Sequence, residues 1–178
     1  SCRPPAASSA SSVVLDDTTG ALVRIGDTVV TDWRLELWRA PVDNDFGAAW
    51  GEPDARPLAT RWSELGLDRL VSRLVSFDAT PDATTVVTRV GGPGRDELVE
   101  LTCAWSTGGA EAVLDVSLTP LVESEQPWAR VGLSFTLPGD YQTAQWFGRG
   151  PGQSYPDTGQ GARLGWYRAT VDELQVKH

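Results

Sequence analysis

Two carboxylates and an amide stand together near residue 44, and their spacing is the first feature of this sequence that could support chemistry. Asp43 and Asp45 flank Asn44. In an extended segment, residues i and i+2 point to the same side, about 6–7 Å apart. Glycoside hydrolysis uses two carboxylates at about this separation, so geometry alone does not exclude the pair. Arg39 precedes both, however, and favours ionised, salt-bridged carboxylates over a proton donor with a raised pKa.

The same residues predict a strand that runs into a polar turn. The apolar run at Leu37 and Trp38 ends at Pro41, which cannot donate a hydrogen bond to a sheet. Aspartate and asparagine favour turns because their side chains accept hydrogen bonds from nearby backbone amides. We therefore expect a loop whose shape is held by four side chains, Arg39, Asp43, Asn44 and Asp45.

A second dense block lies at residues 146–157, and it is rich in glycine and proline. It lacks the Gly-Lys-Ser/Thr ending of a phosphate-binding loop, and it does not pass from a strand into a helix. Gly148, Gly150 and the prolines instead predict a loop whose backbone closely approaches another group. Its polar corners are Arg149, Tyr155 and Asp157, and we expect an Arg149–Asp157 ion pair to close the loop.

Both blocks resemble motifs of the last large domain of family 2 β-galactosidases. Residues 39–47, RAPVDNDFG, are similar to the family's R-A-P-x-D-N-D-x-G signature, and residues 146–157 resemble its W-x-G-x-G-P-x-x-x-Y-P-D motif. The resemblance implies that the catalytic glutamates belong to an upstream (β/α)₈ barrel, and that this chain alone is inactive, with no catalytic residue. It also implies that Phe46, Gly47 and Trp50 edge the substrate pocket of the parent enzyme.

The pattern of apolar residues predicts an all-β fold with one short helix. Residues 58–67 have helical spacing and end at Gly66, a suitable C-terminal cap. Alternating segments predict strands at 13–15, 21–25, 28–31, 71–77, 84–90, 98–105, 112–118, 129–137 and 144–146. Strands at about ten-residue spacing favour an antiparallel sandwich. With the resemblance, this becomes a galactose-mutarotase-like super β-sandwich over residues 13–178, truncated at its C-terminus, after a disordered linker or cloning remnant at 1–12.

Composition limits the partners of the chain. Its 178 residues carry a net charge of −9, which argues against a nucleic-acid surface. No apolar run approaches the roughly 20 residues that span a bilayer, so we expect no membrane partner. The sequence contains no methionine, which indicates a piece of a longer parent. The expected partners are the upstream barrel, the galactoside indirectly, and oligomer contacts. A cytoplasmic parent is favoured, although the two cysteines do not decide the redox compartment.

Metal ions and cofactors are not expected in this chain. No cysteine, histidine or carboxylate spacing resembles a metal site. The resemblance implies that magnesium and sodium, where the parent uses them, are held by upstream residues.

Two other functions remain open from the sequence. A free-standing carbohydrate-binding module would use tryptophan rings as stacking faces on one exposed surface, with Trp38, Trp50, Trp146 and Trp166 as candidates. An aldose epimerase on a similar sandwich would need a general acid and a general base. The one histidine, His178, stands at the terminus, which makes the epimerase the weaker alternative.

Overall fold

The computed structural model describes residues 12–47, 56–107, 111–123, 127–152 and 159–174 of the chain. The chain divides into two compact units, Ser1–Thr136 and Leu137–His178, which are described separately. The predicted linker falls outside the described residues except for Ser12. The single domain predicted over residues 13–178 stays a prediction.

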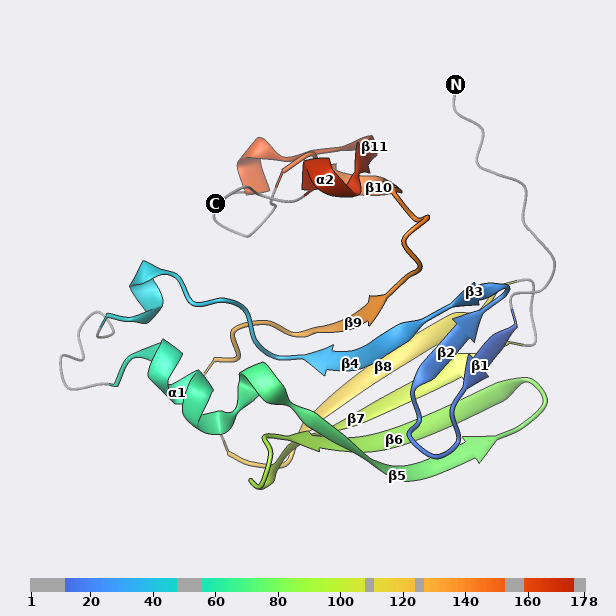
Figure 1. Cartoon of the computed structure of the whole chain (residues 1–178), viewed down its shortest axis with the longest axis horizontal. Helices are drawn as coiled ribbons and strands as arrows, with labels where there is room; N and C mark the ends of the chain where they lie inside the picture. The colour runs from blue at the N-terminus through green and yellow to red at the C-terminus, as the bar shows by residue number, and fades with distance from the viewer. Residues whose placement is uncertain (1–11, 48–55, 108–110, 124–126, 153–158, 175–178) are drawn as a thin grey trace. The chain divides into compact units, whose positions relative to one another are not determined.

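The regular structure of the first unit consists mainly of strands (Figure 1). Its strands are β1 (Val13–Leu15), β2 (Leu22–Ile25), β3 (Thr28–Val29), β4 (Thr31–Glu36), β5 (Val71–Ala79), β6 (Ala83–Gly91), β7 (Glu97–Ser106), β8 (Val113–Pro120) and β9 (Gly132–Thr136). Every pairing between them is antiparallel. The prediction of an all-β, mostly antiparallel sandwich is therefore confirmed.

The long strands form a four-stranded sheet in the order β5-β6-β7-β8, and its two faces differ. Alternate residues of β7 are buried, and Val99, Leu101 and Trp105 face the core. On the opposite face Arg89 lies directly across from Glu100, and its Nε donates a 3.2 Å hydrogen bond to the carboxylate. This alternation is what the period of two in the sequence predicts for a sheet with one covered face.

A second layer covers the apolar face of that sheet. It consists of the small sheet β1-β2-β3 and the pair β4-β9, which Figure 1 shows lying along the four-stranded sheet. Leu22, Leu35 and Leu37 from this layer join one buried cluster with Val90 and Val99 of the long strands. The buried residues of this layer therefore reach to Leu37, two residues before the Arg39–Gly47 motif.

Helix α1 (Leu58–Leu65) is the predicted short helix, and it packs beside this core. Ala59 and Trp62 are its buried residues, and the Trp62 indole donates a 3.1 Å hydrogen bond to the carbonyl of Pro127. The helix ends at Gly66, whose φ of 70° is left-handed, as the sequence predicted for a glycine cap. A single 3₁₀ turn, η2 (Leu67–Arg69), then leads into β5.

The second unit is a β-hairpin with short helical turns. It contains β10 (Thr143–Gly150), η3 (Gly159–Gly161), β11 (Arg163–Thr170) and the single turn α2 (Val171–Leu174). The sequence placed Gly148 and Gly150 in a loop, which was wrong, because β10 continues through both. The close backbone approach is nevertheless present, since a Cβ on Gly150 would lie 2.9 Å from the Tyr167 ring. Strand β11 was not predicted, because aromatic residues on both of its faces hide the alternation.

Candidate binding groove beside the Arg39–Gly47 motif

The Arg39–Gly47 motif is organised around the buried side chain of Asp45. This carboxylate is 5% exposed and closes the 3₁₀ turn η1 (Asp43–Asp45). Arg39 donates two hydrogen bonds to it, from Nη1 to Oδ2 at 2.6 Å and from Nη2 to Oδ1 at 3.1 Å. The backbone N–H of Val42 donates a third, at 2.7 Å, to Oδ2. Three donors on one carboxylate fix the turn against the strand that precedes it.

The surroundings of Asp45 hold it in the ionised form. The Arg39 hydrogen bond is the largest cause that lowers the pKa of this carboxyl below its ordinary value, and the Val42 N–H lowers it further. Burial acts in the opposite direction and is outweighed. An ionised carboxylate with its lone pairs occupied cannot serve as a general acid, so the arrangement is that of a structural anchor.

Arg39 also connects the motif to helix α1. Its guanidinium carbon lies 5.2 Å from the centroid of the Trp62 ring, in cation–π contact. Trp62 is 2% exposed and belongs to the core. The position of the turn is therefore set from two directions, by the end of the strand and by the helix.

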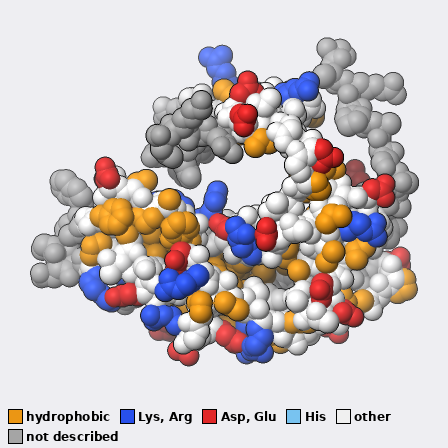
Figure 2. Space-filling model, in the orientation of Figure 1, with side chains coloured by type: hydrophobic (Ala, Val, Ile, Leu, Met, Phe, Trp, Pro, Cys, Tyr) orange, Lys and Arg blue, Asp and Glu red, His pale blue; other side chains and the backbone are white. Residues whose placement is uncertain are grey.

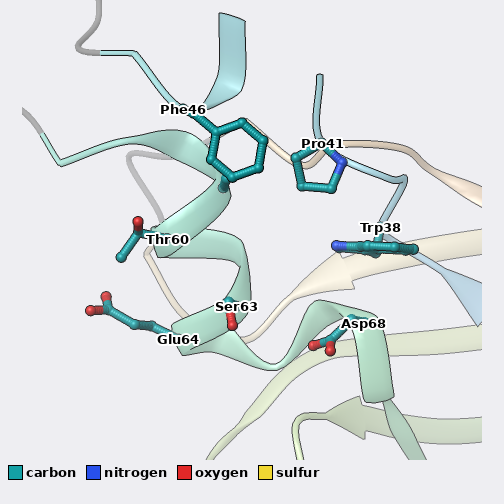
Figure 3. A pocket seen from close by; sticks show the side chains of 8 residues that line it. Trp38, Pro41, Phe46, Thr60, Ser63, Glu64 and Asp68 are labelled. Carbon is teal, nitrogen blue, oxygen red and sulfur yellow. The ribbon is translucent and has the colours of Figure 1, made fainter. Parts of the chain in front are cut away.

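An open groove of about 460 Å³ lies between the motif and helix α1. Figure 3 shows Trp38, Pro41 and Phe46 on one side and polar helix residues on the other. The complete lining is Trp38, Pro41, Phe46, Ala59, Thr60, Ser63, Glu64 and Asp68. Hydrophobic side chains gather at the surface between η1 and α1 in Figure 2. Aromatic walls with a few polar groups are also the lining of many ligand-binding clefts.

Phe46 is the most exposed hydrophobic residue of the groove. Its side chain is 63% exposed although it directly follows the buried Asp45. Opposite it, Glu64 is held by both oxygens to Nη1 of Arg56 at 2.7 Å, which keeps this carboxylate at the rim. The turn therefore presents an aromatic ring to solvent on a rigid support.

The structure brings only part of the predicted site residues together. Those in and beside the turn are Arg39, Asp43, Asn44, Asp45, Phe46 and Gly47. Trp50, Tyr155 and Asp157 fall outside the described residues, so the expected Arg149–Asp157 pair does as well. Arg149 is an exposed residue of β10 in the second unit.

Sequence reasoning missed the helix side of the groove. Thr60, Ser63 and Glu64 occupy positions i, i+3 and i+4 of α1, which places them on one face. That spacing was readable in the sequence. What could not be read was that this face stands opposite Phe46, because twelve or more residues separate them along the chain.

Among the described residues, no group of three or more histidine, cysteine, aspartate or glutamate side chains could hold a metal ion. No helix in the same part of the chain is long and apolar enough to cross a membrane.

Fold and site together define a β-sandwich domain in which a turn, fixed by the Arg39–Asp45 pair, exposes the Phe46 ring beside an open groove. A sequence profile described as "Beta galactosidase small chain" matches residues 7–178. The chain belongs to the β-galactosidase small-chain family.

The individual relatives agree with this assignment. A protein named Beta-galactosidase from Arthrobacter sp. (strain B7) is 33% identical over 172 residues, which is 89% of this chain and 17% of the relative. One of the same name from Vibrio cholerae is 34% identical over 82% of the chain, and one from Psychromonas ingrahamii is 27% identical over 88%. The chain spans only 15% and 16% of the length of these two.

Proposed function

We propose that this chain works as a non-catalytic domain of a β-galactosidase, in which a longer polypeptide hydrolyses terminal β-D-galactosides. The family assignment supports the enzyme, and the small share of the relatives' length supports a domain rather than the whole protein. The pairing of Asp45 with Arg39 is the observation that carries the non-catalytic role, because it leaves the most buried carboxylate of the motif without a proton to donate.

In this proposal the Arg39–Gly47 motif forms one edge of the substrate pocket. Phe46 contacts the substrate or the adjoining catalytic domain, and Gly47 and Trp50 continue the same edge. Arg39, Asp43, Asn44 and Asp45 hold its shape, and Arg149, Tyr155 and Asp157 shape the second loop. The support is physical: an exposed ring on a turn fixed by three hydrogen bonds loses little conformational entropy on contact.

The partners follow from the same proposal. An upstream (β/α)₈ domain supplies both catalytic glutamates, and any magnesium or sodium is held by residues outside this chain. The galactoside meets this chain only at the Phe46 edge, and oligomer contacts add to its structural role.

Complementation tests the proposal. The chain is assayed with a chromogenic β-galactoside by itself and then after addition of the upstream part of its parent. We expect no turnover alone and restored turnover in the mixture. Turnover by the purified chain, abolished by Asp43→Asn or Asp45→Asn, would make the motif a catalytic centre and overturn the proposal.

A substitution tests the edge itself. Phe46→Ala is expected to lower kcat/KM of the complemented enzyme by about tenfold, the cost of one buried aromatic contact at a reacting site. Phe135→Ala is the matched control, since Phe135 is also exposed, at 45%, but belongs to β9. Equal kcat/KM in both variants would remove Phe46 from the pocket.

The alternative of a free-standing sugar-binding module is less well supported. Of the tryptophans in the described residues, only Trp166 is strongly exposed, whereas Trp38 packs against the core and Trp146 stacks on Tyr167. A row of exposed tryptophan rings on one face is therefore missing from the described part of the chain. His178, on which an epimerase would depend, lies outside it.

A further inference from the structure

The hairpin β10–β11 exposes an aromatic face that the proposed pocket edge does not use. Its register places Phe147 opposite Trp166 and Arg149 opposite Leu164. The two rings touch, with centroids 5.4 Å apart and planes inclined at 54°. Phe147 is 59% exposed, Trp166 68% and Leu164 70%. We call this surface the Phe147 face: Gln145, Phe147, Arg149, Leu164, Trp166 and Arg168.

The polar residues of the Phe147 face are donors without partners in the described chain. The side chains of Gln145 and Arg168 form no hydrogen bond or ion pair with another described residue, and the face contains no carboxylate. Arg149 has no such partner among these residues either, but Asp157, its expected partner, lies outside them. Tryptophan, phenylalanine and arginine in one exposed patch are the composition of binding hot spots in protein interfaces. Its positive charge also stands apart in a chain whose net charge is −9.

The other face of the hairpin is aromatic as well. Trp146 and Tyr167 stack there with centroids 5.5 Å apart. Within the described residues of the second unit, Gly150 is the only buried one. A two-stranded hairpin without a core is marginally stable in water, and side chains of this size on both faces are typical of strands covered on both sides. The Phe147 face therefore requires a covering surface.

We infer that the Phe147 face docks onto a protein surface of the longer β-galactosidase-type polypeptide, one that presents a carboxylate to Arg168. This inference rests on the proposed function, because the relatives' length leaves most of such a polypeptide outside this chain. A second copy fits less well. A two-fold contact through this face would bury the arginines of both copies against a face that contains no carboxylate, and burying a charge without a partner is unfavourable.

Cysteine labelling tests the inference. Leu164→Cys is introduced with Cys2→Ser in the 178-residue chain and in the longer polypeptide translated from the full reading frame. The native Cys103 adds little signal, because its side chain is 5% exposed and burial raises the pKa of its thiol to about 11. Each rate is normalised to the rate of the same protein in urea. Arg95→Cys, in the exposed turn between β6 and β7, is the matched control.

The expected result is protection of residue 164 by about tenfold or more in the longer polypeptide, with the control changed by less than about twofold, because a buried thiol reacts only through local opening. Equal normalised rates at residue 164 would overturn the inference. So would protection that appears in the 178-residue chain at higher protein concentration, which indicates a second copy, or on addition of galactose or lactose, which indicates a sugar-binding face.

A second variant removes the dependence on one labelled position. Trp166→Ala should lower the unfolding midpoint of the longer polypeptide more than that of the 178-residue chain, because in the latter the exposed ring loses only its contact with Phe147. Equal shifts in both would argue against docking. Hydrolysis of a β-galactoside by the longer polypeptide is measured in parallel. Protection without hydrolysis refutes the proposed function alone, and hydrolysis without protection refutes the docking alone.

Discussion

Removing the charge of Asp45 tests most directly whether this side chain anchors the Arg39–Gly47 motif. Asp45→Asn keeps the size of the side chain and one acceptor oxygen but removes the anion that Arg39 grips. A hydrogen bond to a charged group contributes about 1.5–3 kcal/mol, and breaking a fully buried ion pair costs about 3–5 kcal/mol. Here the Arg39 side chain is 36% exposed against 6% for Asp45, so water partly compensates the guanidinium. The expected loss is therefore about 2 kcal/mol, near the lower end of these ranges.

The assay is equilibrium unfolding in urea followed by tryptophan fluorescence. Trp62 lies directly against the Arg39 guanidinium and is one of the eight tryptophans that contribute to the signal. Asp43→Asn is the matched control, because Asp43 is exposed and belongs to the same turn. A loss of less than about 0.5 kcal/mol for Asp45→Asn, the usual range for surface substitutions, would refute the reasoning. So would equal losses for Asp45→Asn and Asp43→Asn.

Three further outcomes are expected. Because the pKa of Asp45 is lowered in the folded chain, its ionised carboxylate stabilises the fold fully above the ordinary value of 3.8. This contribution is lost as the pH falls through the lowered pKa. The unfolding free energy should therefore drop less below about pH 4 in Asp45→Asn than in the unmodified chain. Gly150→Ala should destabilise the hairpin by about 1–3 kcal/mol, because its Cβ would meet the Tyr167 ring at 2.9 Å. Both variants are compared in thermal melts. Gly148→Ala, whose Cβ would have its nearest contact at 3.6 Å, should lower the unfolding midpoint less than Gly150→Ala does, and the reverse order would contradict the structure. Cys103 should react with iodoacetamide at pH 8 far more slowly in the native chain than in urea, since burial raises its pKa to about 11; similar rates would show that β7 is not covered.

Local chemistry made most of the secondary structure readable. Alternation along residues 98–105 predicted β7 because a covered sheet face needs an apolar residue at every second position. Gly66 marked the end of α1 because few other residues adopt its left-handed conformation without strain. Both features depend on residues within a few positions of one another.

The hairpin of the second unit shows where this reading fails. Trp146 and Phe147 are neighbours in β10, and Trp166 and Tyr167 are neighbours in β11. Large aromatic side chains therefore point to both faces, so no alternation distinguishes a covered face from an exposed one. Only the register of the two strands showed which rings meet.

The sequence by itself determined the family, the turn chemistry of residues 39–47 and an all-β scaffold, because motif identity and strand period are local properties of the chain. Only the tertiary structure decided that Arg39 binds the buried Asp45 through both carboxylate oxygens, and that the same guanidinium lies over the Trp62 ring. It also decided that α1 stands opposite Phe46 across a groove. The physical reason is that burial distinguishes otherwise equivalent residues, and burial arises from packing between segments that are distant along the chain.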